Sequence, residues 1–407
     1  MPTPRPYQIT GRDFLAARRF ALLADSMRLG KSGQAIAAAK QLGLRRVLVV
    51  CPAIAVPHWM SEFGRWWPEF DGELRAMSYD KMRRGWPQSV DGPRWEVAIV
   101  DEAHFAKSID AKRTKMVYGK DGLGWRADRL WSLSGTPMMN HPGELWPMLK
   151  AFGATGMGYR EFTDRYCTFN KWTGKIVGTN SYRVPELKNI LARVMLRRTL
   201  KEVAPELPDI DFQFLNVEPF EKRDLTIPAG LEGGSLVAWL ESRPAADRED
   251  RQAVAMAKVL PLVEEIGFSI ENRLLPAGVV YGWHVEPLMA LRAALDARGI
   301  SAATITGATP QAMRTDIQTR LREGKLQIVA ANIMAAGTAI DMSTASQGWF
   351  LELDWVGTNN LQAANRLVSM GKTEKVSFAV CTWPGSADDK VQRAIVRKMV
   401  GVKGMGL

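Results

Sequence analysis

Val97-Ala98-Ile99-Val100-Asp101-Glu102-Ala103-His104 is an apolar segment that leads into two carboxylates and a histidine. Its first four residues are apolar, which predicts a short buried strand. Two carboxylates follow, and α/β proteins hold ligands at the carboxyl edge of a parallel sheet. Asp101 would hold Mg²⁺ there, and Glu102 would orient or deprotonate a water that attacks a phosphate. The alternative is an acidic cap on a helix that begins near Ala103.

A second motif, Asp25-Ser26-Met27-Arg28-Leu29-Gly30-Lys31-Ser32, lies between a short apolar run and a predicted helix at 34–41. This is the context of a phosphate-binding loop. Backbone amides and the helix N-terminus would surround a phosphate, Lys31 would add a positive charge, and the Ser32 hydroxyl would ligate Mg²⁺. The match is partial, because the full Walker pattern has glycine where Asp25 stands. A Gly-Lys-Ser without these neighbours would more often be a turn.

Predicted strands and helices alternate along the first half of the chain. Residues 45–52 predict another buried strand, ended by a proline, and residues 130–133 predict a strand that leads into Ser134-Gly135-Thr136-Pro137. The hydroxyls of that tetrapeptide could sense a γ-phosphate, although a plain turn is the alternative. A helix is predicted from Pro6 through Phe20. The βα order predicts an α/β fold with a parallel sheet and a site at the strand C-termini.

The composition suits a globular protein with a polyanionic partner. A chain of 407 residues predicts two domains. Lys and Arg number 54 against 43 Asp and Glu, a net charge of +11, which favours nucleic acid, although a solvated basic surface would give the same balance. Three scattered cysteines and four histidines give little reason to expect disulfides or a metal cage. Without a signal peptide or a bilayer-length apolar run, we expect a soluble, cytoplasmic protein.

Taken together, the motifs resemble the Swi/Snf-type ATPases of helicase superfamily two. The likeness runs from Tyr7-Gln8 to Gly371 and includes the Asp-Glu-Ala-His (DEAH) box. Further strings agree with the family in order and spacing: Gly135-Thr136-Pro137-Met138-Met139-Asn140, Glu144-Leu145-Trp146, Leu196-Arg197-Arg198-Thr199, Glu202-Val203 and Glu206-Leu207-Pro208. The compact chain and its second half look most similar to the fork-remodelling, annealing-helicase subgroup and to small prokaryotic or phage members.

The resemblance implies two tandem RecA-like, parallel-sheet lobes with a helical insertion between them. Residues 1–204 would form lobe 1, with the ATP site and a helical protrusion, residues 205–275 a linker and helical brace, and residues 276–407 lobe 2. ATP and Mg²⁺ would bind in the cleft between the lobes. The implied partner is double-stranded or branched DNA, along which a monomer would translocate in the cytoplasm of a prokaryotic or phage-infected cell.

The resemblance also assigns roles to individual residues. Those implied to bind ATP or Mg²⁺, or to catalyse hydrolysis, are Gln8 at the adenine, Gly30, Lys31, Ser32, Asp101, Glu102, Asp341 at the ribose and Arg366 at the γ-phosphate. Those implied to couple hydrolysis to movement are His104, Ser134, Gly135, Thr136 and Gln362. Those implied to contact DNA are Pro52, Gly307, Thr309, Arg314, Gly337 and Thr338.

The sequence departs from the family at three positions. Ser369 stands where a second arginine would reach the γ-phosphate, and such a charge can be worth ~10³-fold or more in rate. Lys372 or Arg28, which occupies a usual glycine position, could compensate, or the motor could be slow. Ala339 also replaces a glycine. An ATP-gated DNA clamp is therefore the rival to a motor. The Leu-Arg-Arg-Thr string and helical insert disfavour an RNA helicase or restriction-type motor.

Overall fold

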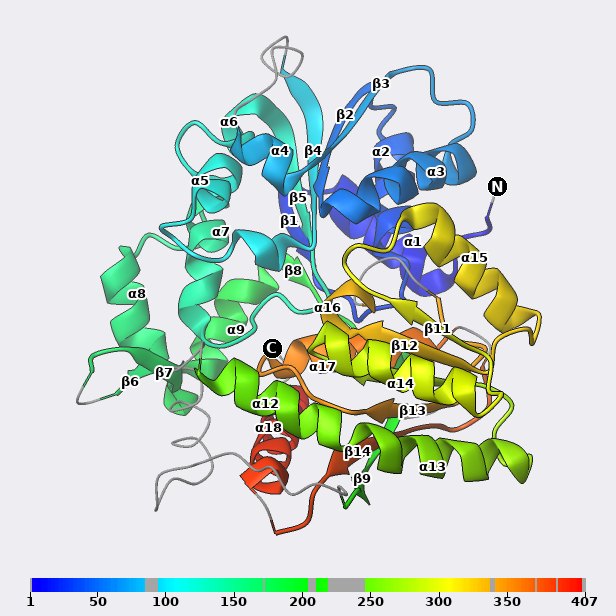
Figure 1. Ribbon diagram of the computed structural model, residues 1–407. Coiled ribbons are helices and arrows are strands. Elements are labelled where there is room, and N and C mark those ends of the chain that lie inside the picture. Colours follow the sequence, from blue (N-terminus) through cyan, green and yellow to red (C-terminus); the bar gives the residue numbers. More distant parts are fainter. Residues whose placement is uncertain are drawn as a thin grey trace. The chain divides into compact units, whose positions relative to one another are not determined.

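The computed structural model describes residues 2–84, 94–170, 173–203, 210–218, 246–336, 341–369, 372–385 and 387–404 (Figure 1). The chain divides into two compact units, one up to Ala204 and the other from Pro205 onward. Each unit is built around a six-stranded sheet. In the described part of the chain, no helix combines the length and the apolar character needed to cross a membrane.

The first unit has a wholly parallel sheet with strand order β3-β2-β4-β5-β1-β8. Its strands are β1 (Phe20–Leu23), β2 (Arg46–Cys51), β3 (Glu73–Ser78), β4 (Trp95–Asp101), β5 (Ala127–Leu133) and β8 (Met195–Leu196). The prediction of a parallel α/β sheet is confirmed. Asp101 pairs with Leu133, so the residues that follow β4 and β5 emerge side by side at the carboxyl edge.

Helices cover both faces of this sheet. They are α1 (Pro6–Ala16), α2 (Lys31–Gln41), η1 (Ala53–Ala55), α3 (Val56–Trp66), α4 (Tyr79–Arg83), η3 (Ala103–Ala106), α5 (Lys112–Tyr118), α6 (Leu123–Arg126), η4 (Pro142–Leu145), α7 (Trp146–Ala151), α8 (Tyr159–Tyr166), η5 (Ser181–Arg183), α9 (Val184–Ala192) and α10 (Leu200–Val203). The hairpin β6 (Cys167–Phe169) and β7 (Ile176–Thr179) is separate from the sheet. Along β2, Val47 and Val49 enter one core and Leu48 and Val50 the other, so the strand is apolar throughout.

The first helix is shorter than the sequence predicts. It ends at Ala16, and Phe20 instead begins β1, where it pairs with Leu130. Phe20 also stacks on Phe152, with ring centroids 5.6 Å apart. The helical prediction failed there because tertiary contacts override local propensity: Phe20 pairs in the sheet and packs, partly buried, against the core.

The second unit repeats the parallel plan, with strand order β11-β12-β10-β13-β14-β9. Its strands are β9 (Ile210–Asn216), β10 (Gly278–Gly282), β11 (Ala302–Ile305), β12 (Ile328–Asn332), β13 (Gln347–Phe350) and β14 (Val376–Thr382). Its helices are α12 (Ala246–Ala257), α13 (Val259–Glu271), α14 (Val285–Ala297), α15 (Gln311–Arg322), α16 (Ile333–Ala336), α17 (Gly357–Ala364), η6 (Asn365–Leu367) and α18 (Ala387–Gly404).

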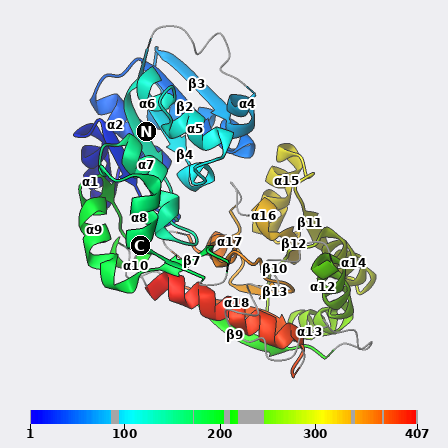
Figure 2. The same cartoon turned by 90° about the vertical axis from the view of Figure 1, so that its left-hand side faces the viewer.

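Of the segment predicted as a linker and helical brace, the described residues 210–218 and 246–275 belong to the second unit. Strand β9 pairs with β14 in parallel from Ile210 to Asn216. Helix α18 runs alongside it (Figure 2), and the Arg393 guanidinium lies 4.3 Å from the centre of the Phe214 ring. The buried face of α13 shares a core with α14. The prolines around this segment suggested a linker, but the alternating pattern of residues 210–214 suits an edge strand.

Candidate nucleotide-binding site

The phosphate loop, residues 25–32, joins β1 to the N-terminus of α2. Gly30 precedes the helix with a φ of +68°, and a Cβ added there would lie 2.5 Å from Nε2 of Gln8. Arg28 also has a positive φ, 69°. The left-handed Gly30 brings the loop directly onto the N-terminus of α2, where the helix dipole favours an anion. The loop therefore meets the helix in the place where a phosphate would bind.

Lys31 and the Ser134-Gly135-Thr136 loop lie close together. The Lys31 ammonium donates hydrogen bonds to the carbonyl oxygens of Asp25 at 2.8 Å and Ser26 at 3.3 Å. A Cβ added to Gly135 would lie 3.4 Å from Nζ of Lys31 and 3.0 Å from Cγ of Met27. Glycine is therefore needed at position 135 because the backbone passes so near the phosphate loop.

Asp101 and Glu102 lie at the end of β4, as predicted. Burial and repulsion from Glu102 raise the pKa of Asp101 to about 6, although a hydrogen bond from Trp59 and attraction to Lys31 oppose the shift. Two adjacent carboxylates in a desolvated position favour a divalent cation, so the donor set fits Mg²⁺. Glu102 precedes η3 but makes no side-chain capping hydrogen bond, so the acidic-cap alternative is wrong.

The predicted coupling residues form a chain across the edges of β4 and β5. Nδ1 of His104 lies 3.3 Å from Oε2 of Glu102 and 3.1 Å from Oγ of Ser134. Oγ of Ser134 in turn accepts a hydrogen bond from the backbone N–H of Thr136, at 3.2 Å. A change at the Glu102 carboxylate can thus reach the Ser-Gly-Thr loop through one buried imidazole.

Two aromatic residues that the sequence did not assign to the site hold the carboxylate pair. The indole N–H of Trp59 donates to Oδ2 of Asp101 at 2.8 Å. The Tyr79 hydroxyl donates to the carbonyl oxygens of Asp101, at 2.8 Å, and Glu102, at 3.3 Å. Glu102 has a left-handed backbone, with φ of 48° and ψ of 53°, which costs a non-glycine residue roughly 1–2 kcal/mol. The Tyr79 hydrogen bonds help to hold this conformation.

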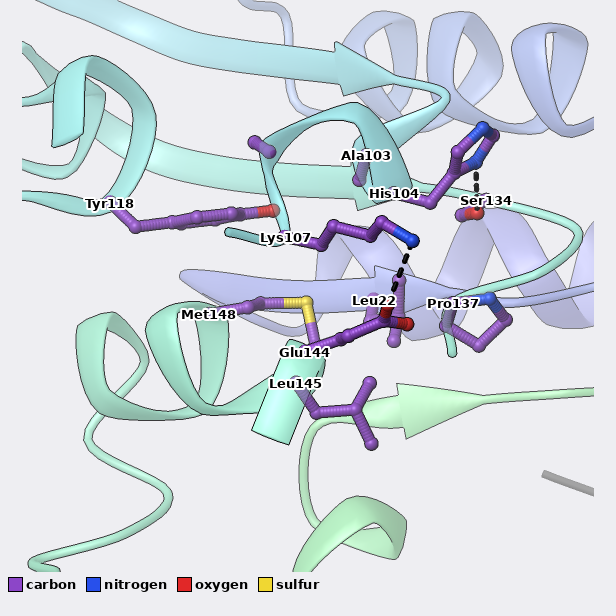
Figure 3. Close-up of a pocket in the computed structure, with 11 residues that line it drawn as sticks. Leu22, Ala103, His104, Lys107, Tyr118, Ser134, Pro137, Glu144, Leu145 and Met148 are labelled. Carbon is purple, nitrogen blue, oxygen red and sulfur yellow. Dashed lines mark hydrogen bonds and ion pairs between the residues drawn. The ribbon is translucent and has the colours of Figure 1, made fainter. Parts of the chain in front are cut away.

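An ion pair links the chain just after the Asp-Glu-Ala-His box to the Glu-Leu-Trp string. Its two residues are Lys107 and Glu144. In the cavity of Figure 3, Nζ of Lys107 lies 2.7 Å from Oε1 of Glu144, beside the His104–Ser134 hydrogen bond. Oε2 of Glu144 accepts the backbone N–H groups of Met139 at 2.8 Å and Asn140 at 3.0 Å. The Glu-Leu-Trp string thereby holds the loop that follows Pro137. The Lys107 ammonium thus has a partner within the protein.

In the second unit, the structure connects Asp341 to Arg366. The backbone N–H of Met342 donates to the carbonyl oxygen of Arg366 at 3.1 Å. Oδ1 of Asp341 accepts the backbone N–H of Ser343 at 3.1 Å. Arg366 is half-buried in η6, and Gln362 is buried on α17. The predicted residues Gly337 and Thr338, together with Ala339, lie outside the described residues.

Lys372 does not suit the role of a replacement arginine. Its ammonium donates to the carbonyl oxygens of Ser343 and Ala345, both at 2.7 Å. Burial lowers its pKa, although Glu374 and Asp341 oppose the shift. Of the explanations for Ser369, compensation by Arg28 and slow turnover therefore remain.

The residues predicted to contact DNA lie in different surroundings. Arg314 is only 2% exposed, and its guanidinium donates to the carbonyl oxygens of Thr306 at 2.7 Å, Thr309 at 2.8 Å and Ala335 at 3.0 Å. It therefore fastens the β11–α15 loop with three of its five N–H groups, and this burial disfavours the predicted contact with a phosphate, which stays a prediction. Gly307 lies in the same loop, where an added Cβ would meet nothing within 4 Å. Pro52 directly follows β2.

The chain is similar to several known proteins. Residues 76–224 match the model of the SNF2-related domain. The SWI/SNF-related matrix-associated actin-dependent regulator of chromatin subfamily A-like protein 1 of Xenopus laevis is 27% identical over 99% of this chain and 44% of its own length. The mouse DNA annealing helicase and endonuclease ZRANB3 is 26% identical over 97% of this chain and 40% of its own length. The chain thus spans less than half of each.

A solved structure, the Sulfolobus solfataricus SWI2/SNF2 ATPase core in complex with dsDNA, is similar to 99% of this chain and 93% of its own, with 19% identity and a TM-score of 0.47. Two parallel-sheet units, with a phosphate loop and an Asp-Glu pair at the carboxyl edge of the first sheet, indicate a nucleotide-binding α/β protein. Residues 76–224 match the SNF2-related domain, and nearly the whole chain is similar to proteins of the Swi/Snf type, in agreement with the resemblance of its motifs.

Proposed function

We propose that this chain is a DNA-dependent ATPase that uses ATP hydrolysis to move along duplex or branched DNA. The observation that carries the proposal is the arrangement at the carboxyl edge of the first sheet. There, Lys31 lies beside Gly135, and Glu102 leads through His104 to Ser134. These are the charges and the connection that a nucleotide-driven motor requires.

In the proposed reaction, Lys31 binds the phosphates of ATP, while the Ser32 hydroxyl and the Asp101 carboxylate hold Mg²⁺. When bound, Mg²⁺ would neutralise phosphate charge and orient the γ-phosphate. Glu102 orients the attacking water, and its carboxylate is already placed by the left-handed backbone at its own position. His104 then relays the loss of the γ-phosphate to Ser134 and the loop that follows.

DNA is the proposed partner because the chain carries a net charge of +11 and resembles a DNA annealing helicase. Contacts would be made mostly to phosphates, so binding should be independent of sequence and sensitive to salt. Pro52, Gly307 and Thr309 remain candidates for these contacts, since each lies in a turn that follows a strand. We further propose a role in DNA replication, repair or recombination, for a monomer in the cytoplasm of a prokaryotic or phage-infected cell.

The test is the initial rate of ATP hydrolysis with no nucleic acid and with linear duplex, forked DNA, gapped DNA or double-stranded RNA. We expect duplex and branched DNA to stimulate ATP hydrolysis and double-stranded RNA to stimulate it only weakly. The stimulation by DNA should decline as salt is added. Glu102→Gln should abolish turnover while ATP binding persists, because the change removes the charge that orients water. The absence of DNA-dependent turnover at saturating ATP would exclude a motor.

An ATP-gated DNA clamp is the second candidate, and the residue that favours it is Ser369. Lys372 donates to two backbone carbonyls, so the ammonium one turn away does not replace the missing guanidinium. A clamp would change its affinity for DNA when a non-hydrolysable ATP analogue binds, yet show no turnover. Ser369→Arg should raise a slow rate by about tenfold or more if the missing arginine limits it. An unchanged slow rate would remove that explanation.

A further inference from the structure

We propose that Trp59 is a positioning residue that holds the Asp101 carboxylate in the orientation that binds Mg²⁺. The inference rests on the proposed ATPase function and assigns a specific task to a core tryptophan. Trp59 lies on α3, far from both motifs in sequence, and its indole N–H donates to Oδ2 of Asp101 at 2.8 Å. The role is distinct from catalysis, because Trp59 would act only through Asp101.

The geometry fixes both oxygens of the carboxylate. Oδ1 accepts the backbone N–H of Glu102 at 3.0 Å, and Oδ2 accepts the Trp59 indole. Each carboxylate oxygen has two acceptor positions, so these bonds set the direction of the group and leave positions for a cation. The Trp59 ring cannot move aside, because it is fully buried and packs against Phe63 with ring centroids 6.5 Å apart.

The neutrality of the donor matters for a carboxylate that must bind a cation. Two structural carboxylates of this unit have cationic partners: Arg198 binds Asp25 and Lys107 binds Glu144. At Asp101, the side-chain donor is a neutral indole, which orients the group without neutralising it. The indole also has one N–H and no acceptor, so it cannot reverse its role.

The structure provides a matched control in Trp131, on β5. Like Trp59, it is fully buried and belongs to the same apolar cluster. Its indole N–H also makes one hydrogen bond, 3.1 Å long, to the carbonyl oxygen of Arg18. Trp59→Phe and Trp131→Phe therefore remove the same atoms from the same core, but only the first removes a donor to Asp101.

The experiment measures ADP affinity with and without Mg²⁺ for wild type and both variants, together with the Mg²⁺ concentration that gives half-maximal ATP hydrolysis. We expect Trp59→Phe to weaken Mg²⁺-dependent ADP binding by at least about tenfold, the typical worth of a hydrogen bond to a charged group. It should raise the half-maximal Mg²⁺ concentration similarly and leave ADP affinity without Mg²⁺ unchanged. Trp131→Phe should change neither the Mg²⁺-dependent ADP binding nor the half-maximal Mg²⁺ concentration. It should lower the stability of the protein about as much as Trp59→Phe does.

Equal effects of the two variants on Mg²⁺ dependence would overturn the proposal, because they would show general damage to the core. The same holds if Trp59→Phe has its full effect in an Asp101→Asn background, where the carboxylate that Trp59 would orient is gone. Trp59→Tyr also lacks the indole N–H and replaces Trp59→Phe if that variant does not fold. Failure of wild type to hydrolyse ATP would instead reject the proposed function, and the ADP measurements would still test Trp59.

Discussion

The Arg198 guanidinium forms a double hydrogen bond with the Asp25 carboxylate, with 2.9 Å between Nε and Oδ1 and 2.5 Å between Nη2 and Oδ2. Asp25 is fully buried and the Arg198 side chain is 14% exposed. The same guanidinium reaches the carbonyl oxygen of Tyr7 and Oε1 of Gln34. The pair therefore joins the first residues of the phosphate loop to the Leu-Arg-Arg-Thr string and to both helices that flank the loop.

Arg198→Met should destabilise the protein by about 3–5 kcal/mol, because it leaves a buried charge without its partner. Denaturation by urea, followed by circular dichroism, measures this loss. Arg45→Met is the control, since Arg45 binds Asp71 at 2.6 Å but both side chains are more than two-thirds exposed, and such pairs contribute about 0–1 kcal/mol. Combining Arg198→Met with Asp25→Leu should recover most of the loss. If the double variant does not recover stability, the Asp25–Arg198 pair stabilises the protein by more than the neutralisation of two buried charges.

Tyr79→Phe should lower kcat by about tenfold while costing about 1 kcal/mol of stability, because it releases the carbonyl oxygens of Asp101 and Glu102. Steady-state kinetics and urea denaturation test the two effects. Tyr166→Phe is the control. Tyr166 is a buried residue of α8, and its hydroxyl donates to Oε1 of Glu186, on α9, at 2.8 Å. Equal losses of kcat in both variants would contradict a specific role for Tyr79 at the Glu102 backbone.

Arg28→Gly should stabilise the protein by about 1 kcal/mol, because glycine adopts the φ of 69° without the steric cost that arginine bears. We expect kcat to fall at least about tenfold, since strain retained at a ligand loop commonly accompanies function. Arg273→Gly provides the matched control: its φ is also positive, 56°, and it lies at the end of α13. It should gain stability with no change in kcat. If Arg28→Gly leaves kcat unchanged, Arg28 does not compensate for the arginine missing at position 369, and slow turnover becomes the favoured explanation.

Glu144→Gln should reduce stability by about 2 kcal/mol at neutral pH and by progressively less as the pH falls below about 4.5. Burial acts to raise the pKa of Glu144, but Lys107 and the hydrogen bonds from Asn140 outweigh it and lower the pKa. A carboxyl group with a lowered pKa stabilises the fold above its unfolded value, and this contribution is lost as the pH falls through the folded value. Urea denaturation at several pH values measures the difference. Lys107→Met should reduce the pH dependence, and a pH-independent difference would contradict this assignment.

Local patterns were enough to predict the parallel strands, the phosphate loop and the Asp-Glu pair. Each depends on a few consecutive residues: an apolar run, a glycine before a helix, or two carboxylates after a strand. The pairing of Asp25 with Arg198 could not be predicted, because 173 positions separate the two residues and neither carries a local signal for the other. The Walker comparison identified Asp25 as unusual but gave no reason for it.

The burial of individual polar side chains was the second feature that the sequence did not reveal. Arg314 follows a turn like those that bind phosphates, but its side chain points back onto three carbonyl oxygens, which no pattern of consecutive residues reveals. Trp59 lies in the core, and its spacing from Phe63 on α3 suits apolar packing but says nothing about a partner for its indole N–H. A buried tryptophan usually finds an acceptor for its N–H. Applying this rule would have prompted a search for the acceptor, although not its identity.

Strand β9 has a practical consequence for dissecting the protein. Its seven residues, Ile210–Asn216, close one side of the second sheet by pairing with β14. A recombinant fragment starting at the predicted lobe boundary, residue 276, would expose the backbone of β14 along that side and invite self-association. Isolated production of this half should therefore begin upstream of Ile210.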